Sequence, residues 1–322
     1  MKKLLLKSAL YAILLLLMLE VWVRIFHLSK DNPVRFIDEK KVEKWMPDQQ
    51  GHSVTGNRRQ NFSEYSINRS GFNSYREFSP TKEKVEIALV GDSFIEGFHQ
   101  NYYNSTGKKI ENKLLGIEVY EYGYAGYDMA DQLHLIHAYK DKFDLIDYVI
   151  LGIKFSNDLG RGSYYNVASR MKFEQPFYRI IRKSKLLVYT QNIGGLDPVR
   201  DLATRIFSVG KTKTSEKKEP TPEEIRQQDE EYLKNLKSLM NEFGFDKERF
   251  VFLLDSRATS RIFIDFLHES NIKYIDFADE FAKAKRSTDL IYDKHWNNYG
   301  RELIARVITS YIKEQEEIKN RN

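Results

Sequence analysis

The chain of 322 residues contains no cysteine. Disulfides, thiolate metal sites and cysteine nucleophiles are therefore excluded together. This absence assigns no compartment, since an exported protein need not carry disulfides. No nucleic-acid-binding module is visible either, so the modest net charge of +5 does not indicate DNA or RNA as a partner. The remaining composition, 41% hydrophobic and 30% charged, is normal for a folded body.

Only one long apolar run is present, from Leu4 to Phe26, and lysines precede it. Its length suits a crossing of the hydrocarbon core, and Glu20 and Arg24 are spaced to pair near the interface. No small-residue cleavage site follows, so we interpret residues 1–28 as an uncleaved signal anchor rather than a cleaved signal peptide. The flanking lysines predict a single-pass protein of the cytoplasmic membrane whose body lies on the extracytoplasmic side.

After the anchor, residues 29–60 show little periodicity and are interpreted as a spacer. Residues 61–322 form the predicted catalytic body, in which strand-like and helix-like stretches alternate. This pattern predicts an α/β fold with a parallel sheet covered on both faces. The predicted strands are 85–90, 117–120, 147–153, 249–254 and 273–275, and the predicted helices are 105–115, 129–139, 222–243 and 299–319.

A basic insert at about 160–220 does not follow this alternation. Residues 161–220 hold 13 Lys and Arg against 5 Asp and Glu. The end of the insert, from Lys211 to Pro220, is polar and lysine-rich, which predicts a mobile stretch. Residues 177–188 mix apolar and basic side chains. We interpret them as a solvated helix packed on the body, or alternatively as a lid that faces lipid headgroups or an anionic polymer.

The motif Gly91-Asp92-Ser93-Phe94 follows the apolar run 87–90, so it places a serine at the carboxyl end of a buried strand. Open α/β sheets carry their chemistry at this edge, although such a tetrapeptide is also ordinary turn composition. A serine hydroxyl needs a base, and the base needs an orienting group. The distant segment Asp293-Lys294-His295 supplies both. We therefore expect Ser93 as nucleophile, His295 as base and Asp293 as its orienting carboxylate.

An attacked carbonyl develops negative charge and requires preorganised donors. Three candidates follow predicted strand ends on one edge: the backbone amides of Ser93 and Gly126 and the side chain of Asn157. We expect these three to form an oxyanion hole. Gly126 could instead serve a tight turn, and Asn157 could cap a helix.

These blocks resemble the four that name the SGNH (GDSL-type) hydrolases. Gly91-Asp92-Ser93-Phe94 is similar to the first block, Gly126 to the second, Ser156-Asn157-Asp158 to the third and Asp293-Lys294-His295 to the last. The resemblance covers most of residues 60 to 315. It implies a three-layer α/β/α sandwich with a central parallel sheet, no metal and no cofactor. It also implies hydrolysis or transfer of ester-linked acyl groups.

Three features depart from the common family pattern. Ser156 stands where glycine is usual, and Tyr122 stands where asparagine often occurs. The acid and base are spaced Asp-x-His rather than Asp-x-x-His and are followed by Trp296, which is similar to the alginate acetyltransferase-like branch. Transferase activity therefore remains open.

The expected function is that of a membrane-anchored serine esterase. The expected substrate is an acylated glycan of the envelope or the extracellular space, from which O-acyl groups, acetyl foremost, are removed. One alternative is an O-acyltransferase that acts on a polysaccharide. A second is a catalytically silent anchored protein that binds a glycan through the basic insert, and a third is a lipid-directed lipase or thioesterase.

Overall fold

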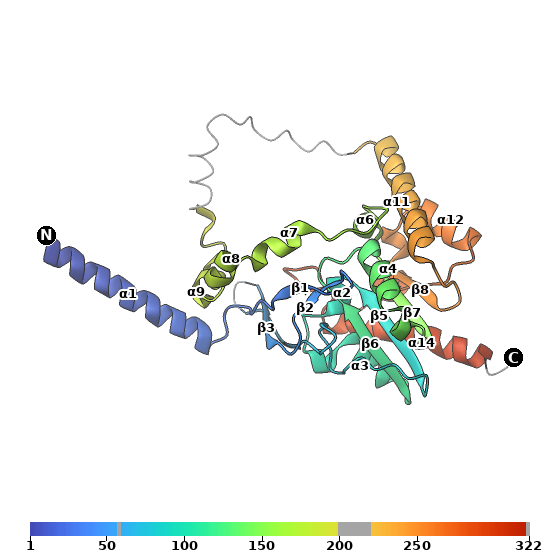
Figure 1. Ribbon diagram of the computed structural model, residues 1–322, viewed down its shortest axis with the longest axis horizontal. Helices are drawn as coiled ribbons and strands as arrows, with labels where there is room; N and C mark the ends of the chain where they lie inside the picture. Colours follow the sequence, from blue (N-terminus) through green and yellow to red (C-terminus); the bar gives the residue numbers. More distant parts are fainter. Residues whose placement is uncertain (57–58, 199–219, 320–322) are drawn as a thin grey trace.

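The computed structural model describes residues 1–56, 59–198 and 220–319 (Figure 1). Its centre is a five-stranded sheet in the order β6-β5-β7-β8-β9, in which every neighbouring pair is parallel. The strands are β5 (Val85–Gly91), β6 (Ile117–Gly123), β7 (Tyr148–Gly152), β8 (Phe250–Leu254) and β9 (Tyr274–Asp276). The predicted parallel sheet is thus confirmed, with strand ends that differ from the prediction by up to three residues.

Helices cover both faces of this sheet. Successive side chains of a strand point to opposite faces, and here the side chains on both faces are apolar and need to be buried. On β5, Ala88 and Val90 belong to one buried apolar cluster, and Ile87 and Leu89 belong to the other. The first cluster includes residues of α4 (Met129–Ala138), α11 (Pro222–Phe243) and α12 (Arg261–Glu269). The second includes residues of α3 (Thr106–Glu111) and α14 (Asn298–Lys319). This is the predicted three-layer α/β/α arrangement.

Short elements complete the body. They are α2 (Ser93–Glu96), α5 (Lys140–Phe143), α6 (Phe155–Asp158) and α13 (Ala278–Ala282), with 3-10 turns at Tyr102–Asn104, Lys172–Glu174 and Ser256–Ala258. Among these, α2 and α6 follow the carboxyl ends of β5 and β7 directly, so they lie at the edge where chemistry is expected.

The amino-terminal helix α1 (Lys2–Ile25) projects away from the body (Figure 1). Its 24 residues span about 36 Å, and it is long and apolar enough to cross a membrane. The expected i,i+4 pair is present, with Arg24 Nη2 2.6 Å from Glu20 Oε1.

Residues 29–60 are folded onto the body, which differs from the spacer interpretation. Strand β1 (Arg35–Ile37) pairs with β2 (Glu43–Trp45), and β3 (Gln50–Thr55) pairs with β4 (Asn61–Ser66), both antiparallel. Val42 and Trp45 are buried in the same apolar cluster as α4. Strands of three residues are too short to produce a periodic sequence pattern, and this explains why the segment looks like a spacer.

The described part of the insert, residues 160–198, contains no strand, in agreement with the sequence pattern. It consists of short helices, namely α7 (Ala168–Met171), α8 (Pro176–Ile181) and α9 (Lys185–Asn192). The predicted mobile stretch from Lys211 to Pro220 lies, apart from Pro220, outside the described residues.

Candidate active site

Ser93 is the first residue of α2, two residues after the end of β5. The Asp92 carboxylate caps this short helix by accepting a hydrogen bond from the backbone N–H of Phe94 at 2.9 Å. The turn packs tightly on the neighbouring strand. A Cβ on Gly123 would lie 2.0 Å from the backbone nitrogen of Glu96, so only glycine permits this approach. The position of Ser93 is therefore set by buried backbone.

The predicted base and orienting carboxylate lie in line with this serine. Ser93 Oγ lies 2.7 Å from His295 Nε2, and the Nδ1–H of His295 donates to Asp293 Oδ1. Lys294, between the two residues, has a φ of 60°, which is in the left-handed region. This turn points the carboxylate and the imidazole at each other across a spacing of only two residues. The structure thus brings Ser93, His295 and Asp293 together in one hydrogen-bonded series.

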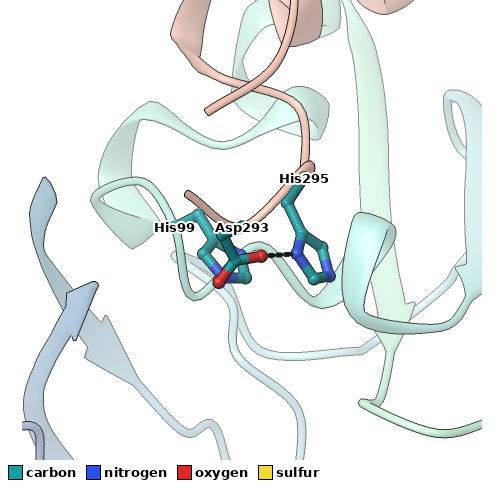
Figure 2. Close-up of side chains that lie close together, drawn as sticks. All are labelled: His99, Asp293 and His295. Carbon is teal, nitrogen blue, oxygen red and sulfur yellow. Dashed lines mark hydrogen bonds and ion pairs between the residues drawn. The ribbon is translucent and has the colours of Figure 1, made fainter. Parts of the chain in front are cut away.

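A second histidine, which the sequence did not single out, contacts the same carboxylate. His99 Nε2 lies 3.1 Å from Asp293 Oδ2, and its ring stacks on that of His295 with centroids 4.1 Å apart (Figure 2). Burial lowers the pKa of His99, which favours a neutral ring that donates its Nε2–H to Asp293. Nothing in the local sequence around His99 distinguishes it from the other histidines.

Hydrogen bonds from His295 and His99 hold the pKa of Asp293 far below its usual value, so this carboxylate is ionised at neutral pH. The ligand atoms of the three residues lie within 4.8 Å of one another, and such a set can hold a metal ion such as zinc. The hydrogen bonds among these residues and Ser93 account for their arrangement without an ion.

The candidate oxyanion donors Gly126 and Asn157 are not joined to the Ser93-His295-Asp293 series by hydrogen bonds among the described residues. Within the described residues, the backbone amides of Ser93 and Gly126 donate no hydrogen bond to the protein. Asn157, exposed in α6, donates from Nδ2 to Asp158 Oδ1 at 3.1 Å and keeps a second N–H.

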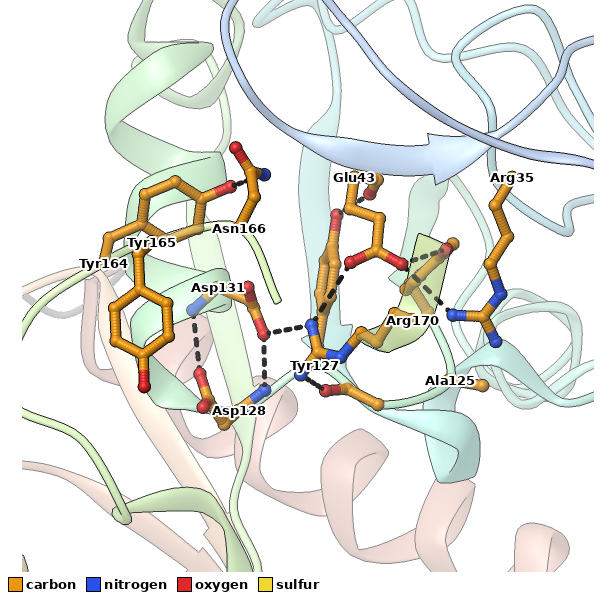
Figure 3. Close-up of polar contacts among 12 residues, drawn as sticks. Arg35, Glu43, Ala125, Tyr127, Asp128, Asp131, Tyr164, Tyr165, Asn166 and Arg170 are labelled. Carbon is orange, nitrogen blue, oxygen red and sulfur yellow. Dashed lines mark hydrogen bonds and ion pairs between the residues drawn. The ribbon is translucent and has the colours of Figure 1, made fainter. Parts of the chain in front are cut away.

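The loop that carries Gly126 is fixed from two sides. On one side, the buried Glu96 carboxylate accepts a hydrogen bond from the backbone N–H of Ala125 at 3.0 Å. On the other, Arg170 of the insert donates to the carbonyl of Gly126 and pairs with Asp131 at 2.9 Å (Figure 3). Gly126 has a φ of 99°, so glycine is the residue that fits this turn. The insert therefore contacts the very loop that the resemblance assigns to the oxyanion hole.

A cavity of about 260 Å³ opens at the carboxyl ends of β5, β7 and β8. Its apolar wall consists mainly of Phe94, Ile153, Phe155, Phe277, Phe281 and Trp296. Asp158 also lines it, and burial, with the nearby charge of Asp92, raises the pKa of Asp158 to about 8. The wall includes the residues that flank Ser93 and His295, so the cavity can take the apolar part of an ester.

Comparison with known proteins gives weak similarities. No family model matches the chain, and no curated protein does either. The chain is similar to a solved structure of a member of the lipolytic protein G-D-S-L family from Veillonella parvula DSM 2008, with 14% identity, coverage of 69% of this chain and 95% of that chain, and a TM-score of 0.38. It is also similar to the lipase/acylhydrolase from Enterococcus faecalis, with 14% identity, coverage of 72% and 96%, and a TM-score of 0.39. Both TM-scores are below 0.5. The function proposed below therefore rests on the geometry of the site.

Proposed function

We propose that the chain is a serine esterase of the SGNH type. The observation that carries this proposal is the 2.7 Å contact between Ser93 Oγ and His295 Nε2, with Asp293 on the other ring nitrogen. The ionised carboxylate fixes the tautomer in which Nε2 is free to accept a proton. Ser93 attacks the acyl carbonyl while His295 takes the hydroxyl proton and passes it to the leaving alcohol. Water then releases the acyl group from Ser93 by the same proton route.

The oxyanion of this reaction is proposed to lie against the amides of Ser93 and Gly126 and the side chain of Asn157. Within the described part of the chain, the backbone N–H groups of the first two residues donate to no protein acceptor, and this supports the assignment. So does the rigid support of the Gly126 loop by Glu96 and Arg170. Removal of one such donor typically lowers kcat by roughly 10²–10³. Asn157→Ala is the variant that tests the side-chain donor alone.

The proposed substrates are O-acyl groups, acetyl foremost, on a glycan of the envelope or the extracellular space. In this proposal α1 anchors the protein in the cytoplasmic membrane, and the body acts on the extracytoplasmic side. The length and apolar character of α1 and the lysines at its amino-terminal end support the location. The glycan rests on that location and on the SGNH resemblance.

Intact-mass analysis of the full chain after exposure to a fluorophosphonate tests the nucleophile. We expect a single adduct on Ser93, absent from Ser93→Ala and from His295→Ala. Hydrolysis of a small aryl acetate should fall by roughly 10⁴–10⁶ in both variants, while circular dichroism remains unchanged.

The failure of folded protein to form an adduct would contradict the esterase proposal. The silent glycan-binding alternative would then be supported by glycan binding that survives Ser93→Ala. If an adduct forms but acyl transfer to a glycan exceeds hydrolysis, the chain is an O-acyltransferase. The Asp-x-His-Trp block is the feature that favours this second candidate.

A further inference from the structure

Residues 172–196 of the insert, here called the platform, are attached directly to α1. The Glu20 carboxylate of α1 accepts hydrogen bonds from the hydroxyl of Ser184 at 3.0 Å and from the backbone N–H groups of Lys185 and Leu186 at 2.9 and 2.8 Å. Arg24 donates to the carbonyl of Lys183 at 2.7 Å. Glu20 thus satisfies backbone groups that the first turn of α9 leaves without an intrahelical partner. The start of α9 lies beside the end of α1 (Figure 1).

With α1 anchored in a bilayer as proposed above, these contacts lie close to the level where the helix leaves it. Glu20 precedes the end of α1 at Ile25 by five residues, a rise of about 8 Å. Trp22 and Phe26 are exposed near this end, and aromatic side chains are typical of the membrane interface. A carboxylate near the hydrocarbon must be satisfied by partners, and the platform supplies them.

The surface of the platform resembles the surface of α1 itself. Phe177 and Ile180 are 68% and 67% exposed, as much as Leu4 and Leu5 of α1 at 69% and 66%. Five Lys and Arg but one acidic residue lie between positions 172 and 185. Among the described residues, no acidic side chain forms an ion pair with Arg179. Exposed apolar side chains interleaved with cations match an anionic lipid surface.

We propose that the platform lies on the anionic lipid surface beside the exit of α1, with Phe177 and Ile180 at the acyl boundary and the basic side chains among the headgroups. The continuity with α1 through Glu20 and Arg24 favours this occupant over a soluble polymer. The preferred interpretation from sequence, a solvated helix packed on the body, leaves these exposed apolar side chains unexplained.

The platform also faces the candidate active site. A cavity of about 170 Å³ is lined by Leu28 and Lys30 after α1, by Tyr189 and Ile193 of the platform, and by Asp293. A platform on the lipid surface therefore holds the site at a fixed height above the membrane. This consequence rests on the proposed esterase activity, whereas the position of the platform rests only on the proposed anchoring of α1 in the membrane.

The natural absence of cysteine allows a direct test, because one engineered cysteine is then the only thiol. The full chain is reconstituted in vesicles of phosphatidylcholine and phosphatidylglycerol in equal parts, with the environment-sensitive fluorophore NBD attached at Phe177→Cys or Ile180→Cys. Leu115→Cys is the matched control, since Leu115 is 95% exposed on the loop before β6. We expect a blue shift and strong quenching by nitroxide-labelled lipids at positions 177 and 180, and neither effect at 115.

Emission at 177 and 180 equal to that at 115 would overturn the proposal. A blue shift without quenching by lipid would also overturn it, because a protein partner would then cover the platform. Phosphatidylcholine alone should weaken the quenching, and Glu20→Gln should weaken it further by loosening α9. Quenching that survives Glu20→Gln in full would overturn the role of the Glu20 contact. The same readout in a Ser93→Ala background separates failure here from failure of the esterase proposal.

Discussion

The turn that carries Ser93 is built largely from buried residues, whereas the loop that carries Asp293 and His295 is more exposed and closed by local hydrogen bonds. In the serine turn, residues 91–97, Ile95 and Glu96 are buried at 2% and 4% exposure. In the histidine loop, residues 289–297, Ile291 is 84% exposed. A hydrogen bond of 2.8 Å from the Leu290 N–H to the His295 carbonyl closes this loop. The position of the nucleophile thus depends on the core, and the position of the base depends on a local turn.

Arg301 and His99 connect the two regions. Arg301, fully buried at the start of α14 just after the histidine loop, donates to the carbonyl of Phe94 at 2.6 Å. Burial lowers the pKa of Arg301 to about 10, and attraction to Glu121 and other carboxylates opposes this effect. Arg301 therefore stays charged at neutral pH beneath the serine turn. His99 follows the serine turn in sequence and contacts Asp293 of the histidine loop.

The largest expected effect, on both stability and labelling, comes from Gly123→Ala, which places a methyl group against the backbone of the serine turn. The added Cβ would lie 2.0 Å from the Glu96 nitrogen and 2.4 Å from the carbonyl carbon of Ile95, both backbone atoms of α2, so α2 must move. We expect the free energy of unfolding to fall by about 3 kcal/mol and fluorophosphonate labelling to be lost. Gly160→Ala is the control, because a Cβ there meets nothing within 4 Å. Equal stability of the two variants in urea unfolding would refute the idea that buried backbone fixes the serine.

The serine turn should also make the stability of the chain depend on pH, through Glu96. Burial raises the pKa of Glu96 from 4.5 to about 7, although hydrogen bonds from Ala125 and Trp45 oppose the shift. Between these two values the folded chain retains a proton that the unfolded chain has released. The free energy of unfolding should therefore fall as pH rises from about 4.5 to 7, by at most about 3 kcal/mol from this group. Glu96→Gln should flatten the dependence of the free energy of unfolding on pH between about 4.5 and 7. If urea unfolding at several pH values gives the same dependence for the variant and the wild type, Glu96 is not its source.

A smaller effect is expected from the contact that links the two regions. His99→Leu removes the donor to Asp293, and we expect kcat to fall by about tenfold with little change in KM. His99→Gln is the matched variant, since its side-chain amide can reach the same oxygen and should restore most of kcat. If both variants lose the same activity, ring stacking on His295 rather than the hydrogen bond is what matters.

The sequence predicted the parallel sheet because its strands have local signals, and the proposed site residues were found through the same strand ends. Strand β8 and residues 87–90 of β5 are continuous apolar runs, and Ser93 stands three residues after the second run. Two features had no local signal. The role of His99 depends on its contact with Asp293, which is 194 residues away in the sequence. Trp45 is buried against Glu96 through a hydrogen bond of 2.7 Å, yet it lies in a strand of three residues that no periodicity can reveal.

The conformation of Lys294 was equally hidden from the sequence, because lysine is not a residue that favours the left-handed region. Lys294→Val should cost about 1 kcal/mol of unfolding free energy, since a branched side chain is strained at a φ of 60°. Lys82→Val is the control, because Lys82 has a φ of 66° but precedes β5, at the opposite end of that strand from Ser93. Both variants should lose similar stability, but only Lys294→Val should lose kcat, by about tenfold or more, because Asp293 then turns away from His295. Full activity of Lys294→Val would mean that the histidine loop tolerates a different turn, and the contrast with the serine turn would then rest on burial alone.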